Sequence, residues 1–243
     1  MRLPGRDMAE LLGRALPTDH ADQVLADHYI EREVGRTAGR PWRVLDLGCG
    51  VGSSLDYFRA RDPHVEWVGI DVPGSPEARD RTRTDARFET FDGLTLPFGD
   101  GSFDLVYCKQ VLEHVRHPPP LLSEVRRVIA PDGWFAGSTS QLETYHSLSL
   151  WNYTPVGFTA LLREAGMAAA ELRPGIDSLT LITWRMMGRP SWFGRWWARP
   201  SPLNRALDLY GKTARLEPRL LNATKLLFCG QFAFLARCDP GPS

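Results

Sequence analysis

The stretch VLDLGCGVGSS, Val44 to Ser54, places three glycines at alternate positions directly after an apolar run. Gly48, Gly50 and Gly52 follow a predicted strand and precede a predicted helix over 53–61. At such a turn the backbone N–H groups point outward, and a ligand can approach a main chain that carries no side chains. The pattern therefore predicts a ligand-binding turn at the carboxyl end of a strand; an ordinary tight turn is the alternative.

Short β-rich runs alternate with segments of helical periodicity along most of the chain. The expected strands are 42–47, 65–72, 87–91, 103–109, 133–139, 168–173 and 230–238. The expected helical segments are 7–38 with a break at Pro17, then 53–61, 119–129, 154–165 and a long section over about 175–227. Strands separated by helices imply right-handed crossovers, and hence an α/β fold with a mostly parallel sheet and helices on both faces.

The expected organisation is a single domain over 1–243. An N-terminal helical extension over 1–40 precedes a cofactor-binding core over 41–174. A helical insertion over 175–227 then separates the core from the final strand at 228–238. Because this insertion is the largest departure from a minimal sheet-and-helix core, it is a candidate for substrate or partner contacts.

The composition narrows the class of partner. The 243 residues include 29 basic and 29 acidic side chains, which cancel to a formal net charge of +0, so we expect no nucleic-acid partner. The four cysteines form no CxxC pair, which favours a reduced cytoplasmic setting. The first residues lack the apolar centre of a signal peptide, and no window approaches the roughly 18 apolar residues of a membrane span. These observations predict a soluble cytoplasmic protein.

Two carboxylates accompany the glycines. Asp46 lies two residues before Gly48, and Asp71 ends the next predicted strand, at the distance of one strand–helix–strand unit. This acid-x-Gly-x-Gly-x-Gly pattern resembles motif I of the class I S-adenosylmethionine-dependent methyltransferases, whose fold is a Rossmann-like seven-stranded sheet. A nicotinamide or flavin fingerprint, GxGxxG, would need glycine at 53, where this chain has Ser53.

The resemblance covers roughly Val44 to Met167. The stretch FDGLTLPFGDGSFDLVYCKQVLEHV, Phe91 to Val115, resembles the LPF-x-D-x-SFD and LEH region of a small-molecule branch that includes ubiquinone and menaquinone biosynthetic methyltransferases. PDGW, Pro131 to Trp134, matches the turn before the fifth strand of that branch. Several landmarks in the same order are more specific than any one of them.

The resemblance implies S-adenosylmethionine as the cofactor. The glycine loop would lie against its methionine and ribose part, Asp71 would hold the ribose hydroxyls, and Asp92 would receive the adenine amino group. Residues after the fourth strand would lie near the methyl group. The implied cofactor-binding set is Asp46, Gly48, Cys49, Gly50, Gly52, Asp71, Val72, Asp92, Gly93, Lys109 and Gln110.

Methyl transfer from a sulfonium is an in-line displacement, so the protein mainly holds a nucleophile close to the methyl carbon. An amine or alcohol must also lose a proton, and the need for a base depends on the acceptor. His114 is the leading candidate base because it follows the fourth strand; a helix-start hydrogen-bond network is the alternative role. The further candidates are Glu113, His146 and Tyr153, for which packing or capping roles stay open. The sequence shows no cluster with metal-ligand spacing, so we expect no required metal.

The segment WRMMGRPSWFGRWWARP, 184–200, holds four of the eight tryptophans and four arginines. Tryptophan and arginine suit the headgroup level of a membrane, so a peripheral membrane contact is one interpretation. The same residues could wall an apolar acceptor pocket or form a homodimer interface. The remaining alternative is a helical cap that packs on the sheet.

The sequence thus predicts an enzyme that moves a methyl group from S-adenosylmethionine to oxygen or nitrogen of a small molecule, which is its expected partner. A sugar-containing or secondary-metabolite intermediate is a plausible acceptor. One alternative is carbon methylation of a quinone-type or lipid-like acceptor. Another is a catalytically silent interaction module, because a fold alone does not prove an activity.

Overall fold

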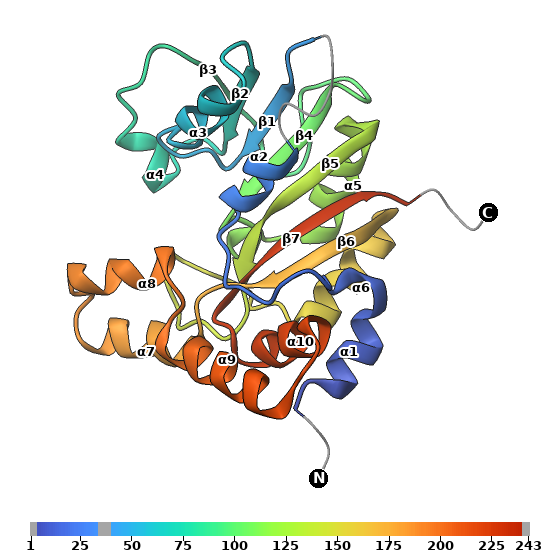
Figure 1. Cartoon of the computed structure of the whole chain (residues 1–243). Helices are drawn as coiled ribbons and strands as arrows, with labels where there is room; N and C mark the ends of the chain where they lie inside the picture. Colours follow the sequence, from blue (N-terminus) through green and yellow to red (C-terminus); the bar gives the residue numbers. More distant parts are fainter. Residues whose placement is uncertain (1–3, 34–39, 240–243) are drawn as a thin grey trace.

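The computed structural model describes residues 4–33 and 40–239. A seven-stranded sheet in the order β3-β2-β1-β4-β5-β7-β6 forms the centre of the molecule (Figure 1). Its strands are β1 Arg43–Leu47, β2 Glu66–Asp71, β3 Arg87–Thr90, β4 Phe103–Lys109, β5 Ile129–Ser140, β6 Met167–Pro174 and β7 Gln231–Cys238. Neighbouring strands are parallel except that β7 is antiparallel to both β5 and β6. The predicted seven-stranded, mostly parallel α/β sheet is confirmed.

Helices cover both faces of this sheet (Figure 1). They are α1 Arg6–Leu12, α2 Asp27–Glu33, α3 Ser54–Arg61, α4 Pro76–Arg79, α5 Pro118–Val128, α6 Pro155–Glu164, α7 Ser178–Met186, α8 Arg195–Ala198, α9 Pro202–Ala214 and α10 Pro218–Phe228, with 3-10 turns η1 Gly13–Ala15, η2 Leu112–His114 and η3 Ser191–Gly194. Successive strand residues point to opposite faces. Accordingly Leu45 and Leu47 join one buried cluster with α1, α5, α6 and α10, whereas Val44 joins another with α2 and α3.

The N-terminal extension is less helical than its periodicity predicts. Residues 16–26 form no helix, and α2 begins only after them, so the helix expected over 7–38 is wrong in this part. Asn222 and the buried Lys225 of α10 donate hydrogen bonds to backbone carbonyls of the segment. Tertiary hydrogen bonds of this kind replace the helical ones and override local periodicity. The part of the expected helix over 34–38 lies outside the described residues.

The strand order reverses at β1, which pairs with β2 on one side and with β4 on the other. In open α/β sheets a crevice forms at the carboxyl ends of the strands where the order reverses. The glycine loop follows β1 directly, so the fold brings it to the place that favours ligand binding.

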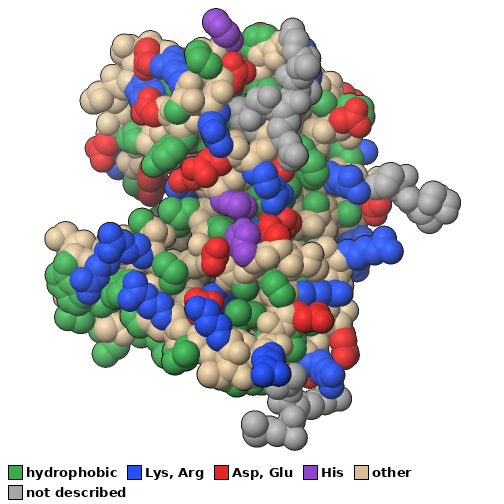
Figure 2. Space-filling view, viewed as in Figure 1, with side chains coloured by type: hydrophobic (Ala, Val, Ile, Leu, Met, Phe, Trp, Pro, Cys, Tyr) green, Lys and Arg blue, Asp and Glu red, His purple; other side chains and the backbone are tan. Residues whose placement is uncertain are grey.

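Helices α7 and α8 project from the sheet at the left edge of the view in Figure 1. Figure 2, drawn from the same side, shows hydrophobic and Lys or Arg side chains gathered over this projection. None of the helices in the described part of the chain combines the length and the hydropathy that a bilayer crossing requires.

Candidate functional site

The glycine loop adopts backbone conformations that favour glycine. Gly48, Gly50 and Gly52 have φ values of 73°, 52° and 81°, in the left-handed region that other residues rarely adopt. A Cβ atom on Gly48 would also lie 2.4 Å from Cγ2 of Val111. The loop is therefore packed against the turn that follows β4, and it leaves no room for a side chain there.

Asp71, at the end of β2, is tied directly to the glycine loop. Its carboxylate accepts a hydrogen bond from the Gly50 N–H at 3.0 Å and another from the Val72 N–H at 2.8 Å. The side chain is largely buried. One carboxylate thus orients the loop after β1 and the chain after β2, which brings two of the predicted cofactor-binding segments together.

Asp46 is the penultimate residue of β1, just before the same loop. It is buried and accepts a hydrogen bond from the hydroxyl of Ser54, the first residue of α3. Burial raises the pKa of the Asp46 carboxyl to about 7; the Ser54 hydrogen bond opposes this shift, and the nearby charge of Asp71 adds to it. Asp46 is therefore poised to gain or lose a proton near neutral pH.

Asp92 and Gly93 follow β3, next to the end of β2. The Asp92 carboxylate accepts hydrogen bonds from the N–H groups of Leu94 and Thr95, at 2.8 and 2.7 Å, and these bonds lower its pKa. Gly93 has a φ of 86°, and a Cβ placed on it would lie 3.5 Å from the exposed Val72. The structure thus brings Val72 and Gly93 together, with an exposed, ionised Asp92 alongside.

Sequence reasoning missed Arg81, which packs on the glycine loop, whereas it named the neighbouring Cys49. The Arg81 guanidinium donates to the Gly50 carbonyl at 2.7 and 2.9 Å and lies 4.0 Å above the ring of Phe88. Cys49 is buried, and burial raises the pKa of its thiol to about 12. Arg81 lies in a stretch of Pro, Gly and charged residues that carries no periodic signal, so only the structure identifies it.

Lys109 ends β4, and Gln110 begins the turn after it. The Lys109 ammonium forms an ion pair with Asp27 of α2 at 3.2 Å, so it faces the N-terminal segment. Gln110 has a φ of 56°, an unfavourable value for a residue with a side chain, and its N–H donates to the Ser138 carbonyl at 2.9 Å. The chain is thus turned sharply at this point, toward the loop at Gly48.

Glu113, His114 and His146 meet beyond this turn. Glu113 is fully buried and accepts hydrogen bonds from the hydroxyls of Thr139 and Ser140, both at 3.1 Å. Burial raises the pKa of Glu113 to about 7. The rings of His114 and His146 are 5.2 Å apart, edge to face.

The two imidazoles are not equivalent. Burial lowers the pKa of His114, the proximity of His146 lowers it further, and its buried Nδ1 has no hydrogen-bond partner among the described residues. Nδ1 of His146 lies 3.6 Å from Glu143, a buried carboxylate that sequence reasoning also missed. Arg185 donates to Glu143 at 3.0 Å. The available signal was an acid three residues before a histidine, directly after the fifth strand.

One donor atom from each of Glu113, His114 and His146 lies within 4.8 Å of those of the other two. In a tetrahedral metal site with bonds of about 2.0–2.1 Å, neighbouring ligand atoms are about 3.4 Å apart. The 4.0 Å between Glu113 Oε1 and His146 Nε2 is wider, and Glu113 Oε2 already accepts a hydrogen bond from the Thr139 hydroxyl. The absence of a required metal stays a prediction.

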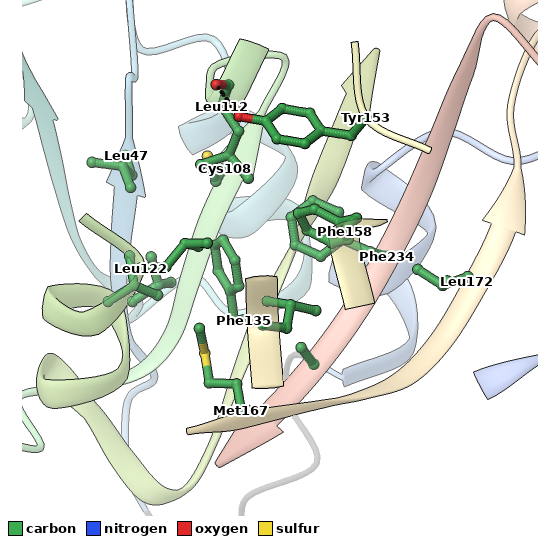
Figure 3. Close-up of a cluster of buried hydrophobic side chains, with 14 of the residues drawn as sticks. Leu47, Cys108, Leu112, Leu122, Phe135, Tyr153, Phe158, Met167, Leu172 and Phe234 are labelled. Carbon is green, nitrogen blue, oxygen red and sulfur yellow. Dashed lines mark hydrogen bonds between the residues drawn. The ribbon is translucent and has the colours of Figure 1, made fainter. Parts of the chain in front are cut away.

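Tyr153 does not face this group. Its hydroxyl donates to the Leu112 carbonyl at 2.9 Å, and its ring lies in the hydrophobic cluster that contains Phe158 and Phe135 (Figure 3). Because its ring is buried and its hydroxyl is hydrogen-bonded to Leu112, Tyr153 packs in the core and holds the turn after β4 against it. This position gives no support to the predicted contact between Tyr153 and the acceptor.

The parallel sheet, the reversal of strand order and the glycine loop define the class of protein, the Rossmann-like α/β enzymes. A family model described as a methyltransferase domain matches residues 6–202. The chain belongs to this family and, through its relatives, to the class I S-adenosylmethionine-dependent methyltransferases.

Two curated relatives illustrate the similarity. A demethylmenaquinone methyltransferase of Deinococcus radiodurans is 37% identical over 103 residues, which are 40% of this chain and 42% of that protein. A malonyl-[acyl-carrier protein] O-methyltransferase of Halorhodospira halophila is 33% identical over 128 residues, 51% of this chain and 43% of that protein. The chain spans less than half the length of the curated relatives that it matches.

A solved S-adenosylmethionine-dependent methyltransferase of Mesorhizobium loti shares the fold. Its TM-score is 0.51 at 18% identity, and the match covers 87% of this chain and 95% of that one. At this identity the likeness extends to the fold alone. It agrees with the architecture expected from the glycine pattern.

Proposed function

We propose that this protein transfers a methyl group from S-adenosylmethionine to an oxygen or nitrogen atom of a small molecule. The observation that carries the proposal is the hydrogen bond from Gly50 N–H to Asp71, which joins the glycine loop to a carboxylate at the neighbouring strand end. A bare loop with a carboxylate beside it suits a ligand that combines a cation with a ribose. When bound, S-adenosylmethionine supplies an activated methyl group on a sulfonium.

The proposed cofactor contacts follow the strand ends. Asp46 and the loop of Gly48, Gly50 and Gly52 would hold the methionine and ribose end, with Cys49 contributing only its backbone because its thiol is buried. Asp71 would accept the ribose hydroxyl protons. Val72 and Gly93 would enclose the adenine, and the free oxygen of Asp92 would receive its amino group. Lys109 and Gln110 would contribute to the methionine side through the turn after β4.

The acceptor would lie against the group of Glu113, His114 and His146. His114 is the proposed base, because a lowered pKa keeps its imidazole neutral at pH 7 and its ring lies beyond the turn after β4, beside His146. A base is useful for an alcohol or amine acceptor. Carbon methylation of a quinone-type or lipid-like acceptor is the second candidate, since the Deinococcus relative is named for a menaquinone precursor.

Titration calorimetry with S-adenosylmethionine and S-adenosylhomocysteine tests the cofactor assignment. Binding of both is expected; binding of neither would leave the silent interaction module, and preference for NADH would indicate an oxidoreductase. A mass-spectrometric screen for the gain of one methyl group across sugar-containing metabolites, phenols, amines and quinones then identifies the acceptor. Fragmentation of the product shows whether oxygen, nitrogen or carbon was methylated.

Replacing Asp71 with alanine is expected to weaken S-adenosylmethionine binding by about 2 kcal/mol, or roughly thirtyfold. The change removes the ribose acceptor and releases Gly50 N–H at the same time. Calorimetry measures the affinity, and Asp132→Ala, at an exposed carboxylate elsewhere, is the matched control. An Asp71→Ala protein with wild-type affinity would contradict the assignment of the ribose site.

Cofactor binding is expected to release a proton from Asp46 near pH 7. A carboxyl with a pKa of about 7 is about half protonated at that pH, and an ammonium or sulfonium bound beside it lowers the pKa. Affinity should therefore rise with pH between about 6 and 8. Calorimetry at pH 7 in phosphate and in Tris should give heats that differ in proportion to the released proton.

Asp46→Asn is the variant that separates this effect from the rest. It should abolish the buffer dependence of the heat, whereas Asp132→Asn should preserve it. Proton uptake on binding, or a buffer dependence that survives in Asp46→Asn, would assign the effect to another group.

A further inference from the structure

The segment from Ser178 to Leu209 combines positive charge with exposed apolar side chains. We call it the α7–α8 lobe; it contains α7, η3, α8 and the first half of α9. Over this range the sequence has five arginines and one acidic residue, Asp208, whose carboxylate pairs with Lys225 of α10. In a chain whose net charge is +0, this is a local excess that the sheet does not share.

The apolar side chains of the lobe are more exposed than a packed helical cap would leave them. Met186 is 83% exposed, Leu179 59%, Met187 54% and Trp192 51%. The lobe also stands away from the sheet, with hydrophobic and basic side chains visible on its surface (Figures 1 and 2). Large apolar side chains gathered at one projecting edge are typical of an interaction surface.

Four of the five arginines of the lobe are free to meet an external negative charge, and the fifth, Arg185, pairs with Glu143. In the described part of the chain, no carboxylate forms an ion pair with any of the other four arginines, which are Arg189, Arg195, Arg199 and Arg205. Arg195 lies 4.6 Å from the ring centre of Trp196, and Arg205 lies 5.1 Å from it on the same ring. Tryptophan bodies with guanidinium groups on their faces suit the boundary between apolar tails and phosphate headgroups.

We propose that the α7–α8 lobe docks on the surface of an anionic lipid bilayer. Exposed methionines and Trp192 would enter the headgroup boundary, and the unpaired arginines would approach lipid phosphates. A two-fold dimer through the same surface would place four unpaired like charges against their copies, which disfavours a second chain as the occupant. Nucleic acid is disfavoured because phosphate tracking does not use exposed Met186 and Leu179.

The lobe adjoins the candidate site through Arg185 of α7, whose guanidinium donates to Glu143 beside His146. Docking would therefore hold the acceptor side of the site close to the bilayer, so that an amphipathic acceptor could enter from the lipid phase. This second step rests on the proposed function, whereas the docking itself does not.

Vesicle flotation tests the docking with the full chain. The wild-type protein is expected to float with vesicles of phosphatidylcholine containing about one third phosphatidylglycerol, and much less with phosphatidylcholine alone. Added salt should weaken the binding, because it screens the arginines. Failure to float with anionic vesicles at low salt would overturn the proposal, and retardation of RNA or DNA without flotation would favour nucleic acid in its place.

Two sets of variants assign the binding to the lobe. Arg195→Gln with Arg199→Gln should lower partitioning to anionic vesicles by about 30-fold, and Met186→Ser with Trp192→Ser should lower it at least about tenfold. The matched controls are Arg6→Gln with Arg163→Gln for charge, and Leu11→Ser, an equally exposed leucine in α1, for apolar area. Flotation that the lobe variants leave unchanged would refute the proposal.

Thermal unfolding and S-adenosylmethionine calorimetry on the same variants keep the two proposals apart. Lobe variants are expected to retain the wild-type melting temperature and cofactor affinity while they lose flotation. A protein that floats but binds no S-adenosylmethionine would support the docking and contradict only the proposed function.

Discussion

Replacing His114 with glutamine is expected to slow methyl transfer by about 10²–10⁴-fold while cofactor affinity stays the same. His114 lies beyond the turn after β4, on the side proposed for the acceptor, and among the described residues its buried Nδ1 has no hydrogen-bond partner. Glutamine keeps a polar group of similar reach but cannot take up a proton. The rate is measured with the acceptor that the methylation screen identifies.

The pH profile separates a base from a merely structural residue. Since burial and His146 lower the pKa of His114, the acid limb of kcat/KM should fall below pH 6.5 in the wild-type protein. The sign follows from the chemistry: protonation of the imidazole at low pH removes the base, so activity is lost as pH falls through that pKa. This limb should disappear in His114→Gln.

His117→Gln is the matched control, because His117 is exposed three residues further along and lies outside the group. It should leave both rate and pH profile unchanged. If His114→Gln also turned over at the wild-type rate, no base would act there, as expected for an already ionised phenol or for carbon methylation.

The sequence predicts the sheet well because the signals for it are local. Gly48, Gly50 and Gly52 indicate a left-handed backbone conformation because glycine is the residue that adopts it readily. The β-rich runs separated by helices are compatible with few sheet topologies. The N-terminal extension fails for the opposite reason. The hydrogen bonds that keep 16–26 out of a helix come from Lys225 and Asn222, about two hundred residues later.

In the candidate site, too, local sequence patterns identify some features, whereas contacts between distant residues determine the others. The spacing of the motif identifies Asp46 and Asp71. It does not show that the Ser54 hydroxyl donates a hydrogen bond to Asp46, or that the Gly50 N–H donates one to Asp71. Tyr153 is the clearest example. From the sequence, its position after the fifth strand allows the side chain to face either the acceptor or the core. In the structure its hydroxyl donates to the backbone carbonyl of Leu112. Which face a side chain takes in irregular segments is decided by packing that no local pattern records.

The same packing makes Gly48→Ala the second prediction with a large expected effect. A Cβ at this position would lie 2.4 Å from Cγ2 and 2.8 Å from Cγ1 of Val111, so either the loop or the turn after β4 must move. The φ of 73° adds about 1 kcal/mol of backbone strain for alanine. Because cofactor contact depends on the loop backbone, S-adenosylmethionine affinity is expected to fall by about 100-fold or more.

A second substitution shows whether the clash is the cause. Val111→Ala removes both methyl groups that the new Cβ would meet, so the double variant should recover much of the affinity and retain only the cost of the left-handed backbone. Calorimetry gives the four affinities of this cycle, and circular dichroism with thermal unfolding verifies that each protein is folded. If Gly48→Ala bound S-adenosylmethionine normally, the cofactor could not depend on this loop. If Val111→Ala gave no recovery in a folded double variant, the loss would come from the backbone conformation alone, and contact between the loop and the turn after β4 would have no part in it.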